Sequence, residues 1–328
     1  MVDESATATL GARDYLAFLE REYLDSYVGR GGAAVKLLAV ADEGTAEVLA
    51  RGLSALGDGF AHVSVDSVTT RIHLIDQAFA ETARQVDWLA LAGAVLARAY
   101  AEIGFPPAGP EHLTVSAVAA HHAVDPAELG RSLRRELERR VLRDAGLSHE
   151  FRTAMFRLCQ YRTGRGDVTR PECESVIGWL RLERVPIGEL RKLSLTAKVG
   201  RHNARAMLLS LSRWLRLAGY AGLVLHLDLT RLAVARRPPA GLRDGHYYSK
   251  AAVLDAYELV RQLVDATDEF EGLLVAVTLP WELIHDEVRG LPAYSALRLR
   301  VIDEVRDRYR VNPYAALVRV SEDTEWPA

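Results

Sequence analysis

The chain has 328 residues and a hydrophobic fraction of 49%, which is typical of a globular protein with a sizeable core. A net charge of −3 excludes a global basic field, so any contact with nucleic acid must be local. No apolar stretch approaches the roughly 18 residues of a membrane-spanning helix, and the N-terminus has no signal-peptide pattern, so we expect a cytoplasmic protein. Cys159 and Cys173 lack metal-ligand spacing, and we expect no metal site.

Hydrophobic periodicity predicts an α/β chain in which short apolar strands alternate with helices. The expected strands are the runs at residues 35–41, 61–66, 222–229 and 272–278. Helical patterns occupy residues 10–28, 72–79, 88–147, 173–182, 203–217, 249–266 and 293–309. Residues 231–248 are rich in Arg, Pro and Gly and favour an exposed loop.

These elements divide the chain into consecutive segments. We expect an N-terminal helix in residues 1–30, the first part of an α/β core in 31–85, a helical insertion in 86–200, the second part of the core in 201–310 and a C-terminal tail in 311–328. The acidic end of the tail favours fraying.

The run at residues 35–41 leads through a short polar turn into a helical stretch, which is the setting of a phosphate-binding loop. The pattern of such a loop is G-x-x-x-x-G-K-[ST]. Its second glycine is present as Gly44, whereas Ala39 replaces the first. Thr45 stands at the lysine position, and Ala46 stands where a hydroxyl would ligate Mg²⁺.

Within this turn, Asp42 and Glu43 place negative charge where a phosphate would lie. Each lost charge-assisted hydrogen bond costs about 1.5–3 kcal/mol. We therefore interpret the turn as part of a nucleotide-binding scaffold that has lost its nucleotide chemistry. On the turn alone, an ordinary strand–helix connection that never bound phosphate is the better interpretation.

Two later strands end in polar side chains. Residues 222–229 have the form of a Walker B strand, in which Asp228 would hold the Mg²⁺ shell. The next position, usually a catalytic Glu in an active ATPase, is Leu229. Thr278 ends the following strand, where many such ATPases have a nucleotide-sensing side chain. A turn or capping role for Asp228 remains open.

Arginines cluster on the helix predicted for residues 127–145. A nucleic-acid contact through this helix would use Arg131, Arg134, Arg135 and Arg139. The alternative, which we favour, is the solvated face of an amphipathic helix whose leucines face a core.

Several short sequences carry a family resemblance. They are GGAAVK at 31–36, GWLR at 178–181, LAGYAGLV at 217–224, LDAYELVRQLVD at 254–265 and RGLPAYSAL at 289–297. In their order along the chain they resemble the BREX-type ATP-binding proteins, the BrxC/BrxD family of bacterial phage-defence islands. The resemblance spans roughly residues 15–310.

This resemblance implies a P-loop NTPase core of the additional-strand, AAA+-like class, with a parallel sheet and a large helical insertion. It also implies work beside a helicase, nuclease or methyltransferase in a DNA-directed system. Because Thr45, Ala46 and Leu229 depart from the family's catalytic residues, we expect a pseudo-ATPase without a cofactor. Such a subunit would scaffold or regulate a paralogous ATPase or helicase in a hetero- or homo-oligomer.

On the last predicted helix, Arg298 or Arg300 falls where an arginine could act in trans on the γ-phosphate bound by a partner. Ion pairing with acids of the same helix (Asp303, Glu304 and Asp307) is the alternative.

Two other functions stay open. An active ATPase with an atypical loop would bind ATP and Mg²⁺. A DNA-binding module would use the basic helix 131–143.

Overall fold

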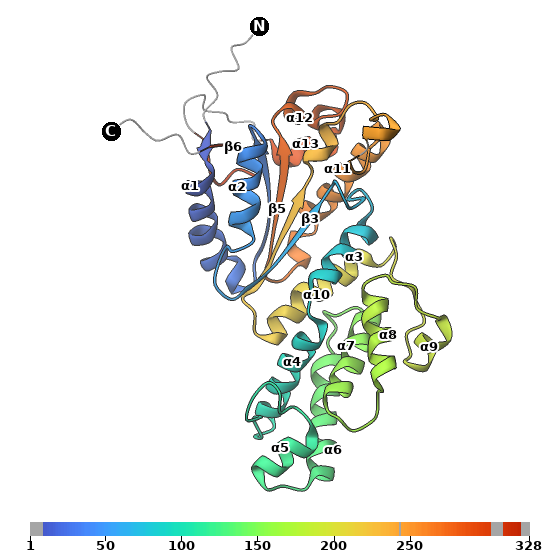
Figure 1. The fold of residues 1–328 in the computed structure, drawn as a ribbon. Helices are drawn as coiled ribbons and strands as arrows, with labels where there is room; N and C mark the ends of the chain where they lie inside the picture. Colours follow the sequence, from blue (N-terminus) through green and yellow to red (C-terminus); the bar gives the residue numbers. More distant parts are fainter. Residues whose placement is uncertain (1–8, 243, 303–310, 323–328) are drawn as a thin grey trace. The chain divides into compact units, whose positions relative to one another are not determined.

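The computed structural model describes residues 9–242, 244–302 and 311–322. The chain forms two compact units, of which unit 1 is drawn from residues 1–78 and 221–328 and unit 2 from residues 79–220 (Figure 1). Within the described ranges, no helix is both long and apolar enough to cross a membrane.

A parallel sheet of six strands forms the centre of unit 1, in the order β1-β6-β2-β5-β4-β3. The strands are β1 (Leu10–Gly11), β2 (Ala33–Val40), β3 (Phe60–Asp66), β4 (Gly222–Asp228), β5 (Leu273–Pro280) and β6 (Leu317–Ser321). The predicted α/β fold with a parallel sheet is confirmed. Because β5 lies between β2 and β4, the sheet is consistent with a P-loop NTPase-like core of the additional-strand class.

Helices cover both faces of this sheet, which explains why β2, β4 and β5 are apolar along most of their length. On one face, Leu38 and Leu274 pack in a core with α1 (Ala12–Phe18), the π-helical segment Leu19–Asp25 and α2 (Glu43–Leu53). Figure 1 shows α11, α12 and α13 on the other side of the sheet. Their bounds are Lys250–Asp265, Glu282–His285 and Ser295–Val301.

Unit 2 is helical and contains the predicted insertion. Its helices are α4 (Trp88–Glu102), α5 (Val115–His122), α6 (Pro126–Leu137) with a π-helical continuation (Glu138–Leu142), α7 (His149–Arg162), α8 (Arg170–Leu180), α9 (Ile187–Lys192) and α10 (Ala204–Ala218). Helix α3 (Ile75–Gln85) runs from unit 1 into unit 2. The unit 2 core contains Phe151, whose ring packs edge-on against Trp88 at 6.0 Å and Trp214 at 6.1 Å between centroids.

Two elements near the C-terminal end differ from expectation. Strand β6 lies inside the segment predicted as a tail, because its run of five residues mixes buried Val318 and Val320 with Arg319 and so lacks a continuous apolar signal. The helix predicted at residues 293–309 is shorter: α13 ends at Val301, and residues 303–309 lie outside the described part.

Candidate functional site

The connection between β2 and α2 is short. Only Ala41 and Asp42 separate the last residue of β2 from the first residue of α2. Asp42 is the N-cap of α2, and its Oδ1 accepts a hydrogen bond of 2.7 Å from the main-chain nitrogen of Thr45. The carboxylate of Asp42 therefore accepts the hydrogen bond of a main-chain N–H group that would bind phosphate in a P-loop.

The side chain at the lysine position points away from this connection. Thr45 has no exposed surface, and its hydroxyl has no hydrogen-bond partner among the described residues. Ala46 is half-buried and packs against the core beneath α2. Side chains at these two positions thus face the protein interior and not a ligand.

Carboxylates gather around the N-terminus of α2. A Cβ built on Gly44 would lie 2.9 Å from Oε1 of Glu322 and 3.4 Å from Oδ1 of Asp42. Glu43 is exposed in the same turn. These negative charges already complement the positive end of the helix dipole, which is the role a bound phosphate would otherwise take. Glu322 follows β6 and could not be placed here from the sequence, because its proximity depends on the pairing of β6 with β2.

Asp228 takes the turn role that the sequence left open. Its Oδ1 accepts a 2.8 Å hydrogen bond from the main-chain nitrogen of Thr230. Asp66, its partner in register on β3, likewise accepts bonds of 2.8 Å from the nitrogens of Val68 and Thr69. The carboxylates at the ends of β3 and β4 therefore stabilise their own turns.

A chain of side-chain hydrogen bonds crosses β3, β4 and β5. His226 places Nδ1 at 3.0 Å from Oγ of Ser64 and Nε2 at 2.9 Å from Oγ1 of Thr278. The predicted sensor residue thus contacts a histidine that sequence analysis did not single out. Burial lowers the pKa of His226, although the nearby charge of Asp228 acts in the opposite direction.

The two arginines proposed to act in trans have different surroundings on α13. Arg300 pairs with Asp265 of α11, with 3.0 Å between Nη2 and Oδ2. Arg298 is exposed and has no ion pair within the described ranges. Leu299 lies between them and is 78% exposed. The alternative acids, Asp303, Glu304 and Asp307, fall outside the described residues.

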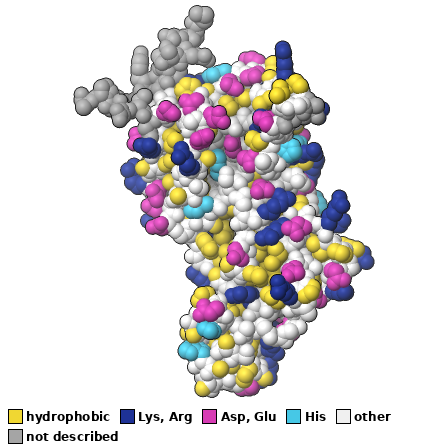
Figure 2. All heavy atoms as spheres, in the orientation of Figure 1, with side chains coloured by type: hydrophobic (Ala, Val, Ile, Leu, Met, Phe, Trp, Pro, Cys, Tyr) yellow, Lys and Arg dark blue, Asp and Glu magenta, His cyan; other side chains and the backbone are white. Residues whose placement is uncertain are grey.

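The arginine-rich helix has the amphipathic pattern that we favoured. Its leucines are buried, and Arg134 pairs with Glu138 at 2.9 Å. Arg139 donates two bonds, of 2.8 and 2.7 Å, to Glu136, and this hydrogen bonding lowers the pKa of Glu136. Arg135 donates to a serine hydroxyl at 3.1 Å, and Arg131 is exposed. On the face drawn in Figure 2, basic and acidic side chains are interspersed.

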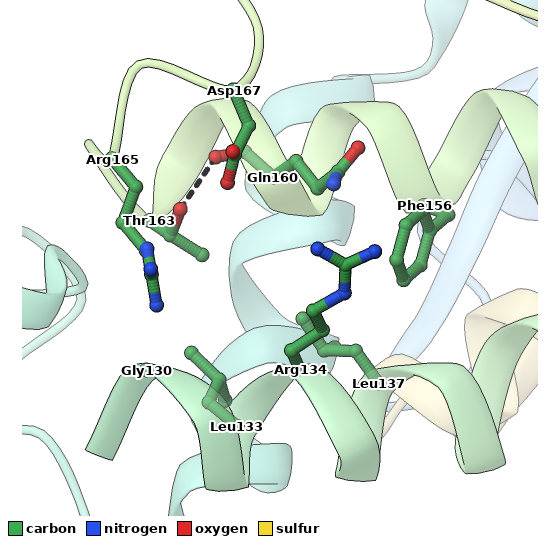
Figure 3. A pocket seen from close by; sticks show the side chains of 9 residues that line it. All are labelled: Gly130, Leu133, Arg134, Leu137, Phe156, Gln160, Thr163, Arg165 and Asp167. Carbon is green, nitrogen blue, oxygen red and sulfur yellow. Dashed lines mark hydrogen bonds between the residues drawn. The ribbon is translucent and has the colours of Figure 1, made fainter. Parts of the chain in front are cut away.

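A small cavity of about 50 Å³ lies between α6 and α7 (Figure 3). Arg134 and Arg165 approach it from opposite sides, and the hydroxyl of Thr163 donates to the carbonyl of Gln160 at 2.6 Å. One water needs about 10–15 Å³ of such space, so the cavity can hold a few waters but is too small for a nucleotide. Elsewhere too, the described residues hold no group of three or more His, Cys, Asp or Glu that could bind a metal.

The cap on α2 can be tested by mutation. We expect Asp42→Ala to lower the free energy of unfolding by about 0.5–2 kcal/mol, because the nitrogen of Thr45 loses its acceptor. Asp42→Ser should retain most of the stability, since serine is also a good N-cap. Urea unfolding followed by circular dichroism measures both variants. Equal loss in both would show that the capping hydrogen bond is not responsible.

The buried histidine predicts a pH dependence of stability. Because the pKa of His226 is lowered in the folded state, the unfolded chain takes up the proton first as pH falls below about 6.5. The stability present above that pH is then lost by up to about 1.4 kcal/mol per pH unit until the folded pKa is reached. Urea unfolding at about pH 7.5 and about pH 5.5 should show a larger loss for the wild type than for His226→Gln. Equal losses of stability in the two proteins would show that His226 is not the source of the pH dependence.

A known protein family matches most of this chain. The family model of the BREX system ATP-binding protein BrxC/D matches residues 112–322. The match includes Asp228, Thr278 and the arginines of α6 and α13, but it begins after the connection between β2 and α2. Searches of curated proteins and of solved structures gave no match. The match covers more than half of the chain and confirms the resemblance seen in the sequence: the chain belongs to the BREX system ATP-binding protein BrxC/D family.

Proposed function

We propose that this chain is a catalytically degenerate P-loop subunit that scaffolds or regulates an active ATPase or helicase in BREX anti-phage defence. The observation that carries the proposal is the carboxylate of Asp42 on the first turn of α2, at 2.7 Å from the nitrogen of Thr45. A P-loop binds phosphate through such main-chain donors. Here the donor is already used by a negatively charged side chain.

The surroundings of this turn add to the electrostatic argument. A phosphate at the N-terminus of α2 would meet the carboxylates of Asp42 and Glu322 without a lysine to offset them. Because Thr45 is fully buried, a lysine at this position would have to leave the core before it could reach the ligand. We infer that the scaffold was retained for a purpose other than hydrolysis by this chain.

Helix α13 supports a role toward a partner. Arg298 is exposed and lacks an ion pair within the described ranges, and the adjacent Leu299 is 78% exposed. An arginine supplied in trans can accelerate phosphoryl transfer by about 10³–10⁵-fold, so a subunit without hydrolysis of its own can still control turnover. In contrast, Arg300 is held by Asp265 and must exchange that ion pair before it can act.

The first test measures hydrolysis by the purified chain. With ATP and Mg²⁺ we expect phosphate release at the rate of the buffer alone, because no lysine or catalytic glutamate is available at the P-loop and Walker B positions. An active P-loop ATPase purified by the same route is the control for the assay. A turnover on the order of 1 s⁻¹, ordinary for an enzyme, would refute the proposal.

The second test adds an active ATPase of the same BREX system. We expect the wild-type chain to raise the partner's turnover. Arg298→Ala should reduce this stimulation at least about tenfold, while the two proteins still bind each other. Arg131→Ala, at an exposed arginine in unit 2, is the matched control. Regulation in trans is excluded if the wild type has no effect, or if neither Arg298→Ala nor Arg300→Ala reduces it.

A further inference from the structure

A pocket of about 470 Å³ lies within unit 1, between the segment that follows β3 and the loop that leads from β4 to α11. Its wall includes Arg71, His73, Arg237, His246, Tyr247 and Tyr248. The N-cap of α11, Ser249, completes the wall, so the positive end of a helix of 16 residues also faces this region. No residue from 39–46 lines the pocket, and β5 separates β2 from β4 in the sheet.

The charge of the pocket favours an anion. Arg71 and Arg237 are exposed, and neither has an ion pair in the part of the chain that is described. None of the described lining residues is Asp or Glu. Two acids of the flanking segments are already engaged: Asp66 caps its own turn, and Asp244 pairs with Arg231. The guanidinium groups at the pocket therefore keep their positive charge available for a ligand.

Buried groups hold the walls of the pocket in place. The hydroxyl of Tyr248 lies 2.6 Å from the carbonyl oxygen of Thr70, and its own carbonyl oxygen accepts a 2.9 Å bond from Arg289. Arg289 is only 6% exposed, and it also donates to the carbonyl oxygen of Leu232 at 2.9 Å. The two loops are thus tied together before a ligand arrives, which lowers the entropic cost of binding.

A buried cation lies behind an aromatic wall. The guanidinium carbon of Arg289 is 6.0 Å from the ring centroid of Tyr247, and its hydrogen bonds go to carbonyl oxygens that carry no net charge. Its positive charge therefore adds to the potential at the pocket. The half-buried ring of Tyr247 supplies a flat surface on which a base can stack.

We propose that this pocket binds a phosphate-bearing nucleotide unit, either as a free nucleotide or as one residue of a single-stranded nucleic acid. Arginine guanidinium groups match phosphate oxygens through paired hydrogen bonds. The volume falls in the range of about 300–1,000 Å³ typical of small-molecule sites and exceeds what inorganic phosphate needs. Neither source of the nucleotide unit requires the turn between β2 and α2.

The experiment compares two probes on the full chain. Calorimetry measures binding of adenosine monophosphate, and fluorescence anisotropy measures binding of a short labelled oligothymidylate. We expect at least one probe to bind, and Arg71→Ala/Arg237→Ala to weaken that binding by at least about 100-fold, since each charge-assisted bond that is removed accounts for about tenfold or more. Arg236→Ala is the matched control, because Arg236 is exposed beside Arg237 but does not line the pocket.

Further variants identify the groups that contact the ligand, and the two probes identify the source of the nucleotide unit. Tyr247→Ala should weaken the bound probe, whereas Tyr247→Phe should retain its affinity because the ring remains. If the oligonucleotide binds, Arg71→Ala/Arg237→Ala should also make the slope of log affinity against log salt shallower by about 0.7 for each phosphate that the protein no longer neutralises. Binding of the monophosphate assigns the site to a free nucleotide, and binding of the oligonucleotide alone assigns it to a strand.

The proposal is overturned if neither probe binds, or if Arg71→Ala/Arg237→Ala and Arg236→Ala bind as the wild type does. These outcomes are independent of ATP hydrolysis, so the pocket and the proposed pseudo-ATPase role can fail separately.

Discussion

Helices cover both faces of the parallel sheet in unit 1, so polar groups are concentrated at the edge where the carboxyl ends of the strands meet. Many groups at this edge are engaged by the protein itself. Asp42 caps α2, Asp228 stabilises the turn after β4, and Thr278 contacts His226. In an active P-loop enzyme, such positions would be kept for nucleotide and metal. Here Asp42 and Asp228 bond to the turns that follow β2 and β4, and Thr278 links β5 to β4 through His226.

Exposed acidic and basic side chains gather at different places along this edge. After β2, the carboxylates of Asp42 and Glu322 surround the first turn of α2. After β3 and β4, Arg71 and Arg237 line a pocket without described acids. We therefore expect an anionic ligand to be disfavoured at the first location and favoured at the second. This separation of charge connects the two proposals physically: carboxylates at the first turn of α2 do not prevent phosphate from binding elsewhere along the edge.

The sequence predicted the parts of the fold that depend on continuous apolar runs. Strands β2, β4 and β5 are buried on both faces, so their composition indicated them directly. Strand β6 was not predicted, because it is short and contains Arg319 between buried valines. The same strand patterns gave the candidate residues Asp228 and Thr278, and the family resemblance added the expected P-loop class of the fold. The details that decide their roles, such as the bond between Thr278 and His226, arise from strand register and not from local sequence. The residues that line the proposed nucleotide pocket are likewise scattered over separate segments, and no motif unites them.

Strand β1 pairs with β6, and β6 in turn pairs with β2. The first described strand of the chain therefore has no neighbour to join until the last described strand has been synthesised. During translation, Leu10 and Gly11 must wait for residues 317–321 to emerge from the ribosome, while β2, β3, β4 and β5 can already assemble. Pairing of β6 with β2 is thus required before β1 can join the sheet, and the same pairing brings Glu322 beside α2.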